Sequence, residues 1–104
     1  MKGRQVSLDI KQYQFYKKLV SLPFVEEIIL YGSRARGDNQ ERSDIDLAII
    51  CPQASDVEWL EIKNIVTSAD TLLHIDCVRF DALKPSSDLK AAIIKEGIKL
   101  HAKY

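Results

Sequence analysis

Three aspartates lie in two segments whose residue pattern predicts β-strands. Asp44 and Asp46 are separated by one residue in the segment 43–51, and Asp76 lies within the apolar run 71–80. Alternate residues of a strand point to the same face, so Asp44 and Asp46 would lie roughly 7 Å apart on one face. Two such carboxylates repel each other, and a sheet tolerates them at an exposed strand end or around a cation.

Asp76 bears on the choice between these two interpretations, because its sequence neighbours have the apolar character of buried residues. If the segments 43–51 and 71–80 are adjacent strands about 4.8 Å apart, Asp76 can lie beside Asp44 or Asp46. Three converging carboxylates would form an oxygen-rich site for hard divalent ions such as Mg²⁺. Two such ions can stabilise the attacking and leaving oxygens of a phosphoryl transfer.

A second candidate segment is Gly32-Ser33-Arg34-Ala35-Arg36-Gly37, which directly follows the apolar run 25–31. Glycine permits a close approach of backbone N–H groups to an anion, and the Ser33 hydroxyl can donate to a phosphate oxygen. Arg34 and Arg36 can neutralise the charge of a triphosphate. The same residues also fit a simple turn that carries two solvated arginines.

A β-sheet would position these candidate residues, and the distribution of apolar and turn-forming residues along the chain predicts one. Strands are predicted at 25–31, 43–51, 71–80 and 98–102. Helices are predicted from a cap at Ser7 to Pro23, from a capping box at Ser55 and Glu58 to Ala69, and from Ser86 or Ser87 to a stop at Gly97.

The order of these elements predicts the fold class. It is α-β-loop-β-α-β-α-β, in which the loop 34–43 includes one helical turn. About 20 residues with a helix separate the second and third strands, which permits a crossover that leaves them parallel. We therefore expect an α/β (α+β) fold with a small mixed sheet of three to four strands and helices packed on it.

Length and composition predict one domain over residues 1–104, of which 46% are hydrophobic and 29% charged. Lys plus Arg and Asp plus Glu each number 15, so the broad positive surface needed to bind nucleic acid or an anionic membrane is not expected. No apolar run reaches the roughly 18 residues of a membrane span. With no signal-peptide pattern and two cysteines that read as reduced, Cys51 and Cys77, the chain is expected to be cytoplasmic.

Taken together, three segments resemble the nucleotidyltransferase superfamily of DNA polymerase β, and in particular its minimal nucleotidyltransferases, or MNT domains. They are Gly32-Ser33-Arg34-Ala35-Arg36-Gly37, Ser43-Asp44-Ile45-Asp46-Leu47 and Ile75-Asp76-Cys77-Val78. The resemblance spans residues 25–80 and extends to the helix-Gly-strand ending, and it implies a nucleotidyltransferase fold.

The resemblance also implies roles for individual residues. Gly32 and Ser33 would hold the β- and γ-phosphates of ATP, and Arg36 would support the phosphates or their loop. The resemblance further implies a catalytic and metal-binding set for two Mg²⁺ ions, made of Asp44, Asp46 and Asp76. Attack of an acceptor hydroxyl on the α-phosphate would then yield a nucleotidylated acceptor and pyrophosphate.

Minimal members of the family are commonly paired with a HEPN-domain protein in toxin–antitoxin systems, and some adenylylate a tyrosine of that HEPN ribonuclease. The resemblance therefore implies an antitoxin that transfers AMP from ATP to a HEPN-type partner, within a hetero-oligomer or a homo-oligomer. Outward apolar residues of the helices, such as Tyr13, Phe15 and Trp59, are candidates for the interface.

Two alternatives remain at the level of sequence. The chain can be a non-catalytic antitoxin that blocks a HEPN ribonuclease by occupancy, although a pure binding module has no need of mutually repelling carboxylates. It can also be a nucleotidyltransferase for a small molecule such as an aminoglycoside, which requires acceptor-binding walls from elsewhere.

Overall fold

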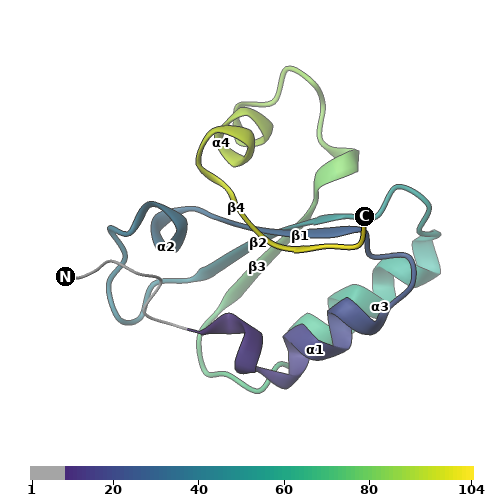
Figure 1. The fold of residues 1–104 in the computed structure, drawn as a ribbon, viewed down its shortest axis with the longest axis horizontal. Helices are drawn as coiled ribbons and strands as arrows, with labels where there is room; N and C mark the ends of the chain where they lie inside the picture. The colour runs from purple at the N-terminus through teal and green to yellow at the C-terminus, as the bar shows by residue number, and fades with distance from the viewer. Residues whose placement is uncertain (1–8) are drawn as a thin grey trace.

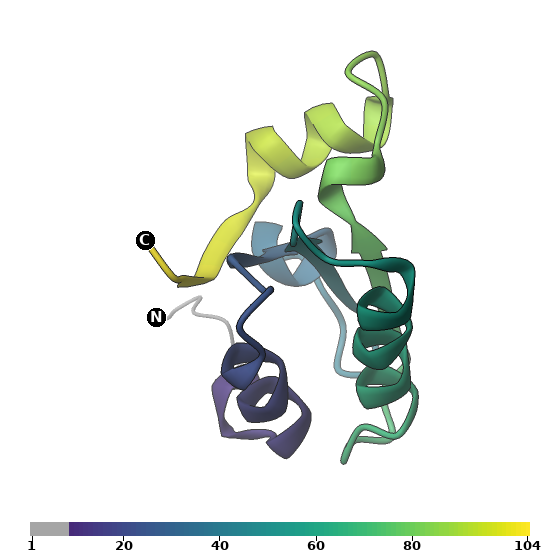
Figure 2. The same cartoon turned by 90° about the vertical axis from the view of Figure 1, so that its right-hand side faces the viewer.

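A four-stranded mixed sheet with helices on both of its faces forms the centre of the molecule (Figure 1). The computed structural model describes residues 9–104, so Ser7, the expected cap of the first helix, lies outside the described residues. Helices α1 (Gln14–Ser21) and α3 (Asp56–Thr67) cover one face, and α4 (Asp88–Glu96) covers the other, as the two views show (Figures 1 and 2).

The strand order of the sheet is β3-β2-β1-β4. Its strands are β1 (Glu27–Tyr31), β2 (Ile45–Ile50), β3 (Ile75–Arg79) and β4 (Ile98–Ala102). Strand β1 pairs antiparallel with β2 and β4, whereas β2 and β3 are parallel. The expected mixed sheet is confirmed, and so is the crossover, because α3 connects the two parallel strands.

Strand alternation gives the sheet two differently covered faces. The larger core joins the face that includes Ile28, Leu30 and Leu47, each 0% exposed, to the helices α1 and α3. A smaller cluster on the opposite face joins Tyr31 and Ala48 to Ile93 of α4. Residues two positions apart on a strand therefore point to the same face of the sheet and pack against the same helices.

The candidate interface at Tyr13, Phe15 and Trp59 does not exist as an outward surface. Phe15 is 1% exposed, and Tyr13 and Trp59 are partly buried against the same core. The buried residues of α1 recur at three- and four-residue spacing on its sheet-facing side, where Leu19 follows Tyr16 by three positions and Phe15 by four. Within residues 9–104, the large apolar side chains that are more than half exposed are Val57, Leu60, Leu72, Ile94 and Tyr104.

The expected first helix is interrupted at Tyr13. A 3-10 turn, η1 (Ile10–Gln12), precedes Tyr13, whose backbone is extended at φ −73° and ψ 146°, and α1 begins one residue later. The Asp70 carboxylate accepts hydrogen bonds from the backbone N–H groups of Gln14 at 3.0 Å and Phe15 at 3.1 Å. A carboxylate distant in sequence thus caps the helix, which explains why a local cap pattern did not locate its start.

The other boundaries follow the sequence more closely. The capping box of Ser55 and Glu58 opens α3, and Ser87 caps α4. The expected helical turn in the loop is α2 (Ser33–Arg36), and a second 3-10 turn, η2 (Phe80–Ala82), follows β3. The strands are shorter than expected, since 25–26, 43–44, 51, 71–74 and 80 lie outside them.

Gly97 ends α4 as expected, but its role is steric. Its φ of −67° is ordinary, so no left-handed conformation is required. A Cβ at this position would overlap the Ile93 carbonyl oxygen and lie 2.5 Å from Cγ2 of Ile29 on β1. The glycine therefore lets the chain pass directly from α4 to the edge strand β4. None of the helices within residues 9–104 is both long and apolar enough to cross a membrane.

Candidate active site

The segments singled out by sequence meet at one end of the sheet, where β1 ends and β2 and β3 begin (Figure 1). Tyr31 of β1 pairs with Asp46 of β2, and Asp46 pairs with Asp76 of β3. Directly paired residues point to the same side of a sheet, so these three side chains share the face that α4 covers. The expectation that Asp76 lies beside one of the paired aspartates is confirmed for Asp46.

Asp44 occupies a different position from the one expected. It lies in the loop before β2 rather than in the strand, and its side chain is exposed. In the part of the chain that the structure describes, no group of three or more His, Cys, Asp or Glu side chains lies close enough together to hold one ion. The expected convergence of carboxylates is therefore present as the pair Asp46 and Asp76, with Asp44 next to it along the chain.

The electrostatics of the pair fit a cation. Burial raises the pKa of Asp46, the charges of Asp76 and Asp44 raise it further, and His74 and Arg36 lower it in part. A divalent ion among these carboxylates would compensate both the lost hydration and the mutual repulsion. The donors are all carboxylate oxygens, which is the ligand chemistry that Mg²⁺ prefers.

Tyr31 adds a neutral hydroxyl to the same row of the sheet. Its side chain is 6% exposed. Burial raises the pKa of Tyr31 to about 12, and the charges of Asp76 and Asp46 contribute to the increase. The phenol therefore stays protonated beside the two carboxylates. Sequence reasoning missed this residue, because its proximity to Asp46 depends on the β1–β2 register.

Gly32 brings the backbone against the Asp46 carboxylate. Its backbone adopts φ 77° and ψ −157°, a region populated almost only by glycine. A Cβ on Gly32 would overlap Oδ2 of Asp46 and lie 3.1 Å from its Cγ. The residue expected to hold phosphate and a residue expected to hold metal are thus neighbours in space.

Ser33 begins the short helix α2 directly after this contact. The first turn of α2 closes on the Gly32 carbonyl, which accepts from Ala35 N at 3.1 Å and Arg36 N at 3.0 Å. Among the described residues, the N–H groups of Ser33 and Arg34 have no protein acceptor. These donors and the half-buried Ser33 hydroxyl directly follow Gly32, which lies against the Asp46 carboxylate, and backbone N–H groups of this kind can bind a phosphate.

The two arginines of the segment have different environments. Arg34 is 3% exposed and donates to the backbone carbonyls of Glu41 and Ser43, so the expectation that it neutralises a phosphate is wrong. Arg36 is exposed and pairs with Asp38 at 3.0 Å and with Glu96 of α4 at 2.8 Å. Arg36 alone therefore offers a solvent-accessible guanidinium from this segment.

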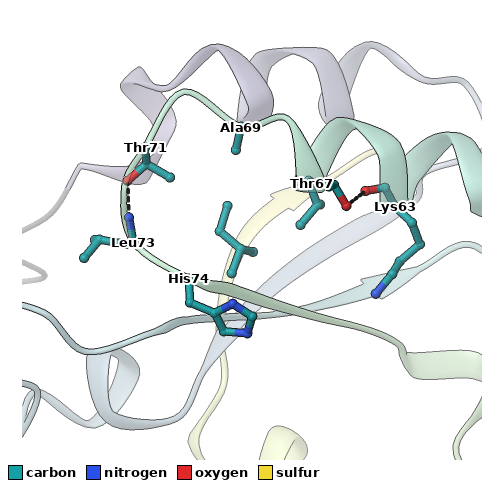
Figure 3. A pocket seen from close by; sticks show the side chains of 8 residues that line it. Lys63, Thr67, Ala69, Thr71, Leu73 and His74 are labelled. Carbon is teal, nitrogen blue, oxygen red and sulfur yellow. Dashed lines mark hydrogen bonds between the residues drawn. The ribbon is translucent and has the colours of Figure 1, made fainter.

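A pocket of about 320 Å³ lies elsewhere, between the C-terminal half of α3 and the start of β3 (Figure 3). Its lining includes Lys63, Thr67, Ala69 and Ile75. Figure 3 shows the His74 imidazole on the other side of the strand from Thr67 and Ala69. The pocket therefore belongs to the α3 side of the sheet, whereas Asp46 and Asp76 point to the α4 side.

Comparison with known proteins identifies the fold. Residues 14–103 match the family model described as Polymerase beta, Nucleotidyltransferase. No protein of the curated set matches this chain significantly. Among solved structures, a toxin–antitoxin crystal structure with AMP-PNP is similar at a TM-score of 0.64 and 21% identity, covering 85% of this chain and 71% of that one.

Two further structures are similar over comparable lengths. A mutant of the MntA-HpeT toxin–antitoxin matches at a TM-score of 0.60 and 18% identity, covering 83% of this chain and 69% of that one. A protein from Sulfolobus solfataricus described as a candidate nucleotidyltransferase matches at a TM-score of 0.56 and 17% identity, covering 86% and 76%. These structures share the fold, and the family model covers most of the sequence. The chain therefore belongs to the polymerase-β-type nucleotidyltransferase family.

Proposed function

We propose that this chain transfers AMP from ATP to a hydroxyl group of a protein partner, in a reaction that depends on Mg²⁺. The observation that supports the proposal most directly is the in-register pair of Asp46 and Asp76 with Gly32 against the Asp46 carboxylate. This arrangement brings anionic oxygens for metal ions next to backbone donors for phosphates, which is the combination that nucleotidyl transfer needs.

Each residue then has a defined task. Gly32 and Ser33 bind the terminal phosphates through N–H groups and the hydroxyl, and Arg36 supplies positive charge beside them. Asp44, Asp46 and Asp76 would hold the Mg²⁺ ions. When bound, Mg²⁺ neutralises phosphate charge and lowers the pKa of the acceptor hydroxyl. Asp76, more exposed than Asp46, is the carboxylate accessible to the proton that the acceptor releases.

The exposure of the site favours a macromolecular acceptor. Asp76 is exposed and Asp46 is half-buried, and the pocket of about 320 Å³ lies on the α3 side of the sheet instead. A small acceptor needs walls that orient it, whereas a protein carries its own tyrosine into an open site. Similarity to toxin–antitoxin structures, one of them with AMP-PNP, supports ATP as donor and a toxin as partner. The resemblance of the sequence to minimal nucleotidyltransferases is the reason to propose a HEPN-type toxin as that partner.

The proposal is tested by incubating the purified chain with a candidate HEPN-domain partner, Mg²⁺ and α-labelled ATP. We expect label on the partner, loss of label with the double variant Asp44→Asn/Asp46→Asn, and normal labelling with Asp56→Asn. Asp56 is an exposed aspartate in the first turn of α3 and serves as the matched control.

Other outcomes would support the alternatives. A stable complex without label would indicate a non-catalytic antitoxin, and full neutralisation of the toxin by the double variant would lead to the same conclusion. Transfer of label to an aminoglycoside, with no labelling of the partner, would indicate a small-molecule nucleotidyltransferase.

A further inference from the structure

The loop formed by residues 37–44 connects α2 to β2 and therefore links the phosphate-binding candidates to Asp44. It begins at Gly37, whose left-handed backbone (φ 87°, ψ 9°) ends α2. Near its other end, Ser43 forms a turn with Gln40: Gln40 N donates to Ser43 Oγ at 2.8 Å, and Ser43 N donates to the Gln40 carbonyl at 3.1 Å. The backbone of the loop is thus folded back on itself.

The Arg34 side chain fastens this loop to α2. Its Nε donates to the Ser43 carbonyl at 3.1 Å, and its Nη2 donates to the carbonyls of Ser43 at 2.8 Å and Glu41 at 3.0 Å. Ser43 directly precedes Asp44, and the next residue, Ile45, enters the β2–β3 ladder through its N–H bond to the His74 carbonyl at 2.9 Å. Asp44 therefore lies between two fixed points of the backbone.

The partners of Arg34 show what the residue does. Although Arg34 is 3% exposed, it forms no ion pair with any carboxylate of residues 9–104. A buried guanidinium is costly unless its donors find acceptors, and here backbone carbonyls accept from Nε and Nη2. An arginine needed only for core packing or charge balance would not require bonds to two carbonyls of one loop. Its rigid planar fork instead sets the path of residues 41–43.

We propose that Arg34 is a positioning residue for Asp44, holding the backbone before it so that its carboxylate can join Asp46 and Asp76 around a divalent ion. The inference rests on the proposed function in that it takes Asp44 as a metal ligand. It also explains the different environments of the two arginines, since one organises the loop and the other is accessible from solvent.

The test uses Mn²⁺ as a spectroscopic probe, because its binding is measurable by electron paramagnetic resonance without any transfer reaction. The variants are Arg34→Gln and Arg34→Lys, with Arg42→Gln as the control. Arg42 is exposed in the same loop, so its replacement removes a charge without removing a loop contact. Amide hydrogen exchange of residues 38–44 is measured in parallel, and urea unfolding verifies that each variant is folded.

We expect Arg34→Gln to bind Mn²⁺ about ten- to hundredfold more weakly, as when the groups that orient metal ligands are removed. Exchange in the loop should accelerate while the sheet stays protected. Arg34→Lys should lie between the two, because an ammonium can retain one carbonyl contact. Arg42→Gln should match the unmodified chain in both measurements.

Two results would overturn the inference. One is a folded Arg34→Gln variant that binds Mn²⁺ as the unmodified chain does, and the other is global unfolding of both Arg34 variants, which would assign the guanidinium to the fold as a whole. Absence of Mn²⁺ binding by the unmodified chain would contradict the proposed function instead. In that case, unchanged amide exchange of residues 38–44 in Arg34→Gln would still refute the role of Arg34 in holding the loop.

Discussion

Replacement of Gly32 by alanine probes the closest contact in the candidate site. The residue adopts φ 77° and ψ −157°, and an added Cβ would overlap Oδ2 of Asp46. The substitution therefore perturbs the backbone and the carboxylate at once. We expect Gly32→Ala to destabilise the chain and also to move the Asp46 side chain away from its place beside Asp76.

The size of the stability effect follows from the backbone conformation. A non-glycine residue in this region costs about 1–3 kcal/mol. The lower entropy of alanine in the unfolded chain offsets about 0.4–1 kcal/mol of this cost. A net loss of about 1–2 kcal/mol would lower the Tm by about 4–16 °C in a domain of this size. The overlap with Asp46 adds to the loss unless that carboxylate rotates away.

Gly37→Ala is the matched control. Gly37 also has a positive φ, at 87°, so alanine there costs about 1–2 kcal/mol of backbone strain. Its substitution places no atom against Asp46. Urea unfolding and differential scanning calorimetry in EDTA measure the shared backbone effect, and Mn²⁺ titration measures the effect on the carboxylates. We expect similar destabilisation of both variants and weakened Mn²⁺ binding only for Gly32→Ala.

The reasoning would be refuted if Gly32→Ala kept the stability and the Mn²⁺ affinity of the unmodified chain. It would also fail if Gly37→Ala lost Mn²⁺ affinity to the same extent, since strain anywhere around α2 would then explain the result. A crystal structure of Gly32→Ala should show the Asp46 carboxylate rotated away from residue 32.

Further predictions concern charge, capping and nucleotide binding. Burial and neighbouring charges raise the pKa of Asp46, so the ionised carboxylate destabilises the fold once the pH exceeds its pKa in the unfolded chain. Asp46→Asn should therefore stabilise the metal-free chain at pH 7 by about 0.2–1 kcal/mol in urea unfolding. At pH 3 the substitution should give no gain. Hydrogen bonds from the backbone N–H groups of Gln14 and Phe15 lower the pKa of Asp70. Asp70→Ala should therefore lower the Tm at neutral pH, and the difference in Tm should vanish as the pH falls through the pKa of Asp70. A difference in Tm that stays constant with pH would contradict the capping role. Ser55→Ala removes the capping box of α3 and should cost about 1 kcal/mol in urea unfolding, against no change if the helix start is set by packing alone. Ser33→Ala should weaken ATP binding about three- to tenfold in calorimetric titration, as expected for one hydrogen bond, and an unchanged affinity would remove Ser33 from the site.

Local patterns in the sequence predicted most of the elements, for an identifiable reason. The capping box at Ser55 and Glu58, the cap at Ser87 and the alternation in the strands each depend on residues within a few positions of one another. The Asp-x-Asp spacing and the glycine after β1 are equally local, so they could be recognised, and the resemblance to the family followed from them. The helix between β2 and β3 was long enough to imply the parallel pair.

The tertiary structure decided which of these residues act together, because their partners are far apart in the chain. The β2–β3 register selects Asp46 rather than Asp44 as the neighbour of Asp76, and the β1–β2 register adds Tyr31. Asp70 caps a helix whose first residues lie more than fifty positions earlier. Such contacts depend on strand pairing and helix packing, which no short window of sequence contains.

The two arginines that follow Ser33 show most clearly what the sequence determined and what the tertiary structure decided. By sequence alone, both Arg34 and Arg36 could neutralise a triphosphate, since both follow the glycine in one charged loop, and the family resemblance implied a role at the phosphates only for Arg36. In the fold, Arg34 is buried against loop carbonyls, whereas Arg36 reaches Glu96 at the end of α4. Residue type and spacing determined that positive charge would lie near the carboxylates, and burial and packing decided which guanidinium supports the backbone and which is accessible from solvent.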